Sequence, residues 1–188
     1  MFPYNLYAGE DGMGTKVLLN ENEFQITLER LAATVLERCR MERFALVGIQ
    51  RRGFPLALRI GKLIGARTQQ GVECGSLDIS FYRDDWTTSN LSPRLNSTEI
   101  PFDVEGRDIL LVDDVLYTGR TVRAALEALL DYGRPASIRL LALVDRGHRE
   151  LPIYAEFVGR EIATSATEKV DVFVREYDGR EGVFLNQQ

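Results

Sequence analysis

The segment from Ile109 to Leu130 constrains the fold more than any other part of the chain. Residues 109–112 are all large and apolar, which is typical of a strand buried on both faces, as in a parallel sheet. Two carboxylates, Asp113 and Asp114, follow at the point where we expect this strand to end. After a short loop, apolar residues recur at helical spacing up to Leu130. The segment therefore predicts a strand, an acidic tip, a loop of small residues and a helix, which is a unit of an α/β fold.

This unit has the composition of a sugar-phosphate site. In open α/β sheets, ligands bind at the carboxyl ends of the strands. The amides of loop 117–121 and the helix N-terminus that follows can hold a phosphate. Asp113 and Asp114 can accept hydrogen bonds from the vicinal hydroxyls of a ribose. A phosphate cradle one short loop away from such an acidic pair predicts that a sugar phosphate binds here.

Two other interpretations of the acidic pair stay open. In the simpler one, the carboxylates only solvate the end of the strand, and Thr118 caps the helix. In the other, the chain is a phosphoacceptor receiver domain, whose first strand also ends in paired aspartates. Against the receiver, the pair lies past the middle of the 188-residue chain, and nothing in a receiver calls for the sequence Thr-Gly-Arg-Thr at 118–121.

Length, composition and charge indicate a globular protein of one domain. A chain of 188 residues with 45% hydrophobic and 27% charged residues is long enough for a sizeable core. The net charge of -5 gives no overall basic field that would draw it to nucleic acid, although a local basic face remains open. Cys39 and Cys74 lack metal-ligand spacing and are expected to be reduced core thiols. Because no apolar run reaches membrane-spanning length, we expect a cytoplasmic protein.

The rest of the chain reads as alternating helices and strands. Residues 1–16, rich in glycine, predict a mobile N-terminal tail before a single domain over residues 17–188. Asn20 and Glu23 resemble a capping box for a helix that ends near Arg40. The other expected elements are a buried strand at 44–49, a helix from Pro55 to about Ile64, a half-exposed strand through Leu77, Ile79 and Phe81, a buried strand at 138–144, and short strands at 155–158, 170–174 and 182–185.

Two loops outside the central unit have compositions that indicate function. Gln50-Arg51-Arg52-Gly53 connects the strand at 44–49 to its helix. Gly53 lets the backbone approach a ligand closely, and adjacent arginines supply cationic donors for phosphates. The long polar stretch 82–98 predicts a lid over a binding site, or alternatively an extended surface hairpin.

The segment from Ile109 to Thr121 resembles the phosphoribosyl pyrophosphate (PRPP) motif of the type I phosphoribosyltransferases. The resemblance implies a central, mainly parallel sheet flanked by helices, with a small cap, or hood, and a flexible lid loop. It implies PRPP binding by Val112, Asp113, Asp114, Val115, Leu116, Tyr117, Thr118, Gly119, Arg120 and Thr121. It further implies a pyrophosphate loop of Arg51, Arg52 and Gly53, often with a cis peptide, and a lid of Tyr82, Arg83, Asp84 and Asp85.

Within this superfamily the chain looks like the pyrimidine-operon regulatory (PyrR) family. The resemblance rests on Asp145–Pro152, with Val-Gly-Arg at 158–160 and Thr-Ser at 164–165. It implies uracil phosphoribosyltransferase activity, in which uracil and PRPP give UMP and pyrophosphate, together with binding of a messenger RNA leader. The catalytic residues implied are Asp113, Asp114 and Arg83, and the base pocket is expected to include Leu116, Arg146 and Val170. Magnesium is expected to bind through PRPP rather than through a dedicated protein motif.

The chain departs from this family's pattern in two places. Arg51 stands where the family usually has threonine, and this change leaves the anion-binding character of the loop intact. RNA-binding relatives carry paired basic residues and a histidine in the first helix, where this chain has Gln25, Ile26 and Ala33. Three alternatives therefore stay open: an enzyme that also binds RNA, an enzyme alone, and an RNA-binding regulator with little activity. A transferase for another base, such as a purine, is a further alternative, against which the Asp145–Pro152 signature argues.

The remaining expectations concern partners and single residues. The sole histidine, His148, is expected to be structural, because the family's chemistry needs no such base. A homo-oligomer, dimeric or higher, is implied by the family, and no membrane partner is expected. Candidates for a basic RNA-binding face are Arg30, Arg38, Arg134, Arg139, Arg149 and Arg160.

Overall fold

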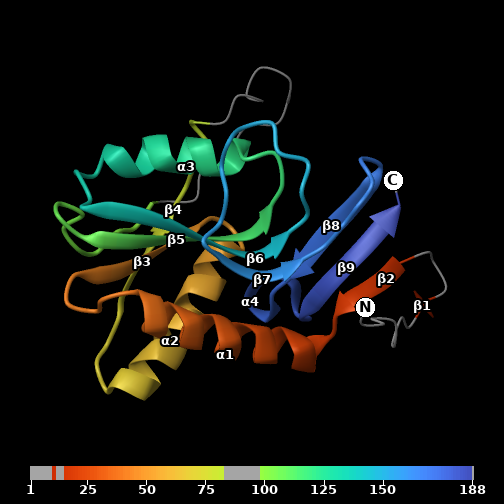
Figure 1. The fold of residues 1–188 in the computed structure, drawn as a ribbon, viewed down its shortest axis with the longest axis horizontal. Helices are drawn as coiled ribbons and strands as arrows, with labels where there is room; N and C mark the ends of the chain where they lie inside the picture. The colour runs from red at the N-terminus through yellow and green to blue at the C-terminus, as the bar shows by residue number, and fades with distance from the viewer. Residues whose placement is uncertain (1–9, 12–14, 83–97, 188) are drawn as a thin grey trace.

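The computed structural model describes residues 10–11, 15–82 and 98–187. It contains a five-stranded sheet and a separate four-stranded sheet, with helices on both faces of the larger one (Figure 1). The elements are β1 (Glu10–Asp11), β2 (Thr15–Leu19), α1 (Glu21–Arg38), β3 (Phe44–Ile49), α2 (Gly53–Thr68), β4 (Glu73–Leu77), β5 (Asp108–Leu116), α3 (Arg120–Leu130), β6 (Ser137–Asp145), β7 (Phe157–Glu161), β8 (Glu168–Phe173), α4 (Arg175–Asp178) and β9 (Gly182–Gln187).

The larger sheet has the strand order β4-β3-β5-β6-β7 and is parallel throughout. Its side chains alternate between two apolar layers because successive residues of a strand point to opposite faces. Leu46, Leu110 and Val112 pack in one layer with residues of α1 and α2. Val47 and Leu111 pack in the other layer with residues of α3. This doubly covered sheet confirms the predicted type of fold and explains why its strands are apolar without alternation.

The smaller sheet is the hood that the resemblance implies. It has the order β1-β2-β9-β8, with all pairs antiparallel, and joins strands from the two ends of the chain. Val170, Val172 and Val183 from its strands belong to the same apolar layer as Phe24 and Leu28 of α1. The hood therefore lies beside the carboxyl ends of the large sheet, toward which β5 and β6 point in Figure 1.

The first helix begins as the sequence predicts. The Asn20 side chain accepts from the Glu23 amide at 3.0 Å, and the Asn20 amide donates to Glu23 Oε2 at 2.9 Å, which completes the capping box. Within the predicted tail, residues 10–11 and 15–16 lie in β1 and β2. The mobility of the tail and the single domain over 17–188 stay predictions.

Several element bounds differ from expectation. The predicted strand through Leu77, Ile79 and Phe81 is wrong: β4 ends at Leu77, and the Asp78 side chain accepts from the Ser80 amide at 2.8 Å, which turns the chain. The strand β5 does not end at Val112 but continues to Leu116, because the equally long β6 pairs with it as far as Leu116↔Asp145. The strand predicted at 155–158 begins later, because β7 runs from Phe157 to Glu161 and pairs with β6 in the large sheet.

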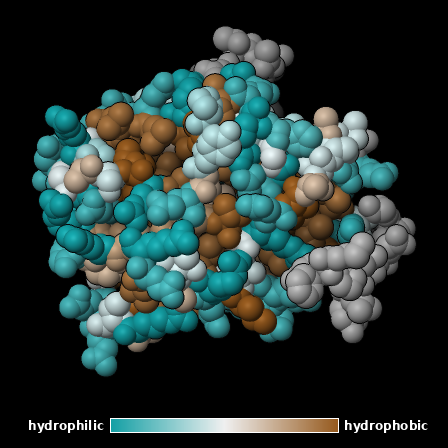
Figure 2. Space-filling view, in the orientation of Figure 1, coloured by the Kyte–Doolittle hydropathy of each residue, from teal (hydrophilic) through white to brown (hydrophobic). Residues whose placement is uncertain are grey.

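Other predicted elements are confirmed, among them the strand at 44–49. The lid residues Arg83, Asp84 and Asp85 lie outside the described residues. Among the residues that are described, no helix combines the length and apolar character needed to cross a membrane. Figure 2 shows a largely hydrophilic face with a hydrophobic patch in the region of α3, whose final residue, Leu130, is 54% exposed.

Candidate functional site

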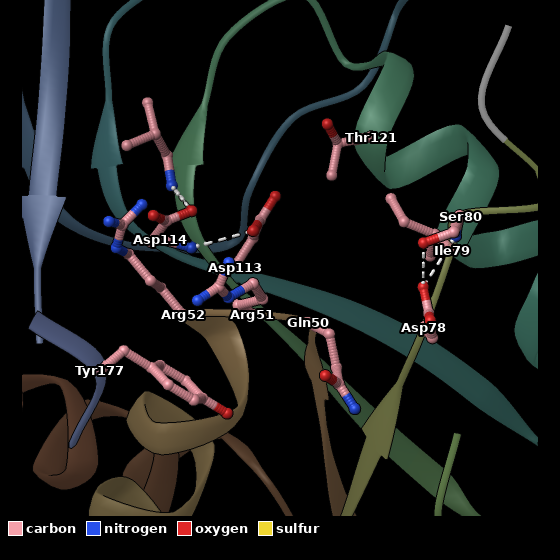
Figure 3. Close-up of a pocket in the computed structure, with 11 residues that line it drawn as sticks. Gln50, Arg51, Arg52, Asp78, Ile79, Ser80, Asp113, Asp114, Thr121 and Tyr177 are labelled. Atoms are coloured by element: carbon pink, nitrogen blue, oxygen red, sulfur yellow. Dashed lines mark hydrogen bonds between the residues drawn. The ribbon is translucent and has the colours of Figure 1, made fainter. Parts of the chain in front are cut away.

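A cavity of about 520 Å³ lies at the carboxyl ends of β3, β4 and β5 (Figure 3). It brings together the acidic pair, the arginine loop and the start of α3, which lie far apart in the sequence. Its lining residues are Gln50, Arg51, Arg52, Asp78, Ile79, Ser80, Asp113, Asp114, Val115, Thr121 and Tyr177. A ligand in this cavity would meet carboxylates and guanidinium groups at the same time.

The acidic pair lies within the last part of β5. Asp113 is 4% exposed, and its Oδ1 accepts from the Asp114 amide at 3.0 Å. Asp114 Oδ1 accepts from the Val115 amide at 2.9 Å. Burial raises the pKa of Asp114, while the positive charge of Arg52 and these local hydrogen bonds oppose the shift. The pair thus combines hydrogen-bond acceptors with a buried charge that Arg52 compensates.

Two glycines, Gly48 and Gly53, allow the arginine loop to lie directly against β5. A Cβ atom on Gly53 would overlap the Val112 carbonyl, and one on Gly48 would overlap the backbone of Gly53 and Phe54. Only glycine allows this close approach, which brings the loop to the start of the acidic pair. The peptide bond between Gln50 and Arg51 is cis, as the resemblance implies.

Arg52 also joins the site to the hood. Its Nε and Nη2 donate to the two carboxylate oxygens of Asp178 in α4, at 3.1 and 2.9 Å. The Val174 amide donates to Asp178 Oδ2 at 2.9 Å, so the carboxylate itself is held in place. The Arg52 guanidinium holds the pKa of Asp178 below its usual range. Beside this pair, the Arg51 guanidinium lies 5.6 Å from the centre of the Tyr177 ring.

The predicted phosphate loop lies at the start of α3, and only part of it reaches the cavity. Thr121 lines the cavity, whereas Tyr117, Thr118, Gly119 and Arg120 do not. Gly119 has φ 92° and is the N-cap residue of α3, and the hydroxyl of the preceding Thr118 accepts from the Arg120 amide at 3.3 Å. The loop backbone is held by the segment after β6, because the Thr118 carbonyl accepts from the amides of residues 150 and 151 at 3.0 and 3.1 Å. A helix N-terminus beside the acidic pair suits a phosphate group.

The predicted base-pocket residues are not brought into this cavity. Leu116 and Val170 are buried in apolar clusters. Arg146 is 6% exposed, and its Nη2 donates to the carbonyls of Ser165 and Glu168 at 3.2 and 2.6 Å. Its guanidinium lies 4.2 Å from the centre of the Tyr117 ring, so it joins the phosphate loop to the hood.

His148 has surroundings that fit a structural role. Its backbone has φ 57°, and its Nε2 lies 2.6 Å from the Thr164 carbonyl oxygen. Its ring meets the Tyr117 ring edge-on at 6.0 Å. These contacts hold the loop after β6, and no part of His148 lines the cavity.

Sequence reasoning missed five lining residues: Gln50, Asp78, Ile79, Ser80 and Tyr177. Asp78 Oδ1 accepts from the amide and the hydroxyl of Ser80 at 2.8 and 2.5 Å. Its Oδ2 is buried without a hydrogen-bond partner among the described residues. If the sequence analysis had ended the strand at Leu77, it would have placed Asp78, Ile79 and Ser80 at the carboxyl ends of the strands, where ligands bind. Nothing in the sequence signalled Tyr177.

The donor set suits a metal held jointly with a substrate. In the part of the chain that the structure describes, no group of three or more His, Cys, Asp or Glu side chains could hold a metal ion. The carboxylates of Asp78, Asp113 and Asp114 nevertheless line the cavity. Carboxylate oxygens are suitable ligands for Mg²⁺, which commonly keeps water and substrate phosphates as its other ligands.

Comparison with known proteins defines the class. Residues 14–177 match the phosphoribosyl transferase domain family, and the chain belongs to it. Solved structures of similar fold include hypoxanthine phosphoribosyltransferases from Trypanosoma cruzi (TM-score 0.69, 18% identity, 96% of this chain and 94% of that one) and Staphylococcus aureus (TM-score 0.66, 21% identity, 92% of each chain).

Relatives with higher sequence identity show to which family of phosphoribosyltransferases the chain belongs. The chain is 52% identical to the bifunctional protein PyrR of Thermus thermophilus over 169 residues, which cover 89% of this chain and 93% of the relative. It is 46% identical to that of Syntrophobacter fumaroxidans, over 93% of this chain and 94% of the relative. The chain belongs to the PyrR family.

Gly53→Ala is expected to destabilise the protein, because a Cβ atom there overlaps the Val112 carbonyl and the backbone must move apart. Overpacking of this kind costs about 1–3 kcal/mol. Gly71→Ala is the matched control, since a Cβ atom at Gly71 meets nothing within 4 Å. Thermal unfolding of both variants measures the difference. Equal melting temperatures would contradict the close packing of the loop on β5.

Proposed function

We propose that the protein is a uracil phosphoribosyltransferase, converting uracil and PRPP to UMP and pyrophosphate, and that it is also a UMP-responsive RNA-binding attenuator of pyrimidine genes. The observation that carries the proposal is the cavity in which Asp113 and Asp114 face Arg52, beside the N-terminus of α3. Membership of the PyrR family, whose members are called bifunctional, supports both parts.

In this proposal the acidic pair holds the ribose. Asp113 and Asp114 accept hydrogen bonds from its hydroxyls, while the amides of residues 117–121 and the hydroxyls of Thr118 and Thr121 hold the 5′-phosphate. The anomeric carbon gains positive charge as the bond to pyrophosphate breaks, as it does in glycoside cleavage. The two nearby carboxylates offset that charge, so the protein contributes position and electrostatics rather than a covalent intermediate.

The leaving pyrophosphate is assigned to the arginine loop. Arg52 keeps Nη1 for the ligand while Nε and Nη2 donate to Asp178, and Arg51 borders the same cavity. Mg²⁺ is proposed to bind through PRPP, where it would neutralise negative charge on the substrate beside the cavity carboxylates. Arg83 is proposed to join from the lid, whose closure would exclude water from the reaction.

The base is assigned to the region between Leu116 and the hood, with Arg146 and Val170 beside it. Leu116 and Val170 are buried. Arg146 fixes the hood carbonyls around Ser165 and Glu168, and backbone groups of that kind can pair with the edge of uracil. Action as a homo-oligomer in the cytoplasm is part of the same proposal.

Asp113→Asn and Asp114→Asn are expected to lower turnover of uracil and PRPP by about 100-fold or more, the scale of removing one preorganised electrostatic contact. Steady-state kinetics with a panel of bases measures the effect and tests the choice of uracil. Asp103→Asn, a change of an exposed aspartate outside the cavity, is the control. Near-normal turnover in both site variants would refute the ribose assignment, and turnover of a purine instead of uracil would refute the base.

The pH dependence of the reaction is expected to show the raised pKa of Asp114. Because burial raises the pKa of Asp114, the carboxyl takes up its proton at a higher pH than an exposed aspartate does. A protonated carboxyl is a poorer acceptor for ribose hydroxyls, so kcat/KM should fall on the acid side at a pH above the ordinary range of aspartate, which is about pH 4. An acid limb at or below that range would show that Asp114 is not the group that titrates.

Hydrogen bonds within the protein limit how many of the candidate arginines can contact RNA. Four of the six candidates donate to groups inside the protein. Arg30 bonds the Gly159 carbonyl, Arg139 that of Arg38 at 2.9 Å, Arg149 that of Tyr117 at 2.7 Å, and Arg160 that of Leu18. Guanidinium groups that are used in this way have fewer donors left for phosphates.

RNA binding is therefore expected to be weaker than in strongly basic relatives and steeply dependent on salt, because phosphate contacts dominate such affinity. UMP in the catalytic cavity should strengthen it by linkage. Titration of a pyrimidine-operon leader RNA at two salt concentrations, with and without UMP, measures both effects. Absence of binding at low salt would leave the enzyme alone, whereas tight binding insensitive to salt and UMP would contradict the electrostatic argument.

A further inference from the structure

A second cavity, of about 280 Å³, lies at the amino ends of the strands of the five-stranded sheet. It is formed at the amino ends of β3, β5 and β6 and by the chain that leaves α1. Its lining residues are Arg38, Cys39, Arg40, Arg43, Phe44, Asp108, Ile109, Ser137 and Arg139. Because β5 runs from Asp108 to Leu116, this cavity lies beyond the opposite end of the strand from the acidic pair.

The second cavity is strongly basic. Four of its nine lining residues are arginines, and Asp108 is its only carboxylate. This local excess of positive charge occurs in a chain whose net charge is -5. The Asp108 carboxylate accepts from the Ser137 hydroxyl at 2.6 Å, and Glu156 lies 3.6 Å from Arg139 at the edge of the cluster. Two carboxylates therefore face four guanidinium groups.

The backbone that carries these arginines is fixed on two sides. Arg139 Nη1 donates to the Arg38 carbonyl at 2.9 Å and lies 3.3 Å from Cys39 Sγ, which joins the end of α1 to β6. The Asp108 amide donates to the Arg43 carbonyl at 3.0 Å, which joins the same turn to β5. The arginines thus project from an ordered turn rather than from a free loop.

Three of the four guanidinium groups are available to a ligand. Arg38, Arg40 and Arg43 are exposed, and within the described ranges no side-chain hydrogen bond or ion pair engages them. By contrast, Arg52 and Arg59 at the other end of the molecule are paired with hood carboxylates. Like charges gathered around one cavity repel one another, and an anion placed between them relieves that repulsion.

We propose that this second cavity is an anion-binding site that takes the phosphate groups of a phosphorylated ligand. Guanidinium groups bind phosphate oxygens through charge-assisted, often bidentate hydrogen bonds, which an ordered backbone favours. The ligand is either a small phosphorylated molecule or the backbone of a single-stranded RNA, since both present the same group. The site is separate from the catalytic cavity and does not depend on phosphoribosyl transfer.

The test uses the full chain and inorganic pyrophosphate, followed by backbone amide NMR. Titration should shift the amides of residues 39–43 and Ser137, in addition to those of residues 50–53 in the catalytic cavity. In the double variant Arg40→Gln/Arg43→Gln, the apparent Kd read from the first set should rise by about tenfold or more, because two charge-assisted contacts are lost. The shifts at 50–53 and the turnover of uracil should stay as in the wild type.

Arg67→Gln is the matched control, because Arg67 is exposed, lies outside both cavities and is not among the candidates for the RNA-binding face. It should leave the shifts of residues 39–43 unchanged, and matching melting curves would show that all variants are folded. The proposal is overturned if pyrophosphate leaves these amides unmoved in the wild type, or if the double variant binds at this site with unchanged affinity.

A single-stranded RNA oligonucleotide, titrated into the same proteins at low and moderate salt, distinguishes the two sources of phosphate. A loss of RNA affinity confined to the double variant identifies the RNA backbone as a ligand of the site. Unchanged RNA affinity, together with weakened pyrophosphate binding at residues 39–43, identifies a small phosphorylated ligand.

Discussion

The parallel pairing of β3 with β5 is the constraint on which the catalytic cavity depends. Its register sets Gly48 beside Val112, so the chain leaves β3 next to the point where the acidic pair begins. The turn that follows must then pass over the end of β5, and it does so with Gly53 against the Val112 carbonyl. Side chains at Gly48 or Gly53 would separate the two loops. The geometry of the cavity therefore depends on two positions that contribute no functional group.

A second interaction couples this edge of the sheet to the hood. Arg52, the N-cap residue of α2, pairs with Asp178. Further along α2, Arg59 pairs with Glu176 and Glu181. The Glu181 side chain is 1% exposed, so its charge has to be compensated within the protein. These pairs attach α2 and its N-cap residue to the chain between β8 and β9. A displacement of the hood would consequently move Arg52, and with it the charge facing Asp114.

The sequence was informative where function depends on neighbours in the chain. Strand, acidic pair, loop and helix are contiguous from Ile109 to Leu130, and their apolar pattern identified a buried parallel strand with a site at its end. The arginine loop was recognised for the same reason. The cap residue Asn20 was also predictable, because both partners of a capping box lie within one turn.

The sequence was uninformative where function depends on residues brought together by folding. The pairing of Arg52 with Asp178 joins positions 126 residues apart, and no local pattern at Arg175–Asp178 indicates it. Asp78 was missed because apolar alternation through Phe81 resembled a longer strand, whereas the Asp78 side chain ends β4 by its bond to Ser80. The candidate arginines for RNA binding were chosen by charge alone. Charge does not show which guanidinium groups donate hydrogen bonds within the folded protein.

That last point separates the two ends of the sheet in physical terms. At the carboxyl end, arginines and carboxylates are interleaved, and Arg52 faces both Asp114 and Asp178. A site that carries both charges, each partly compensated before a ligand arrives, suits a ligand with an anionic group and sugar hydroxyls. At the amino end, Arg38, Arg40 and Arg43 surround a cavity with a single lining carboxylate. An uncompensated cluster lowers the stability of the folded protein slightly through self-repulsion, and it gains most from an anion. We therefore propose that the carboxyl ends of the strands take a sugar phosphate and that the amino ends take a phosphate group alone.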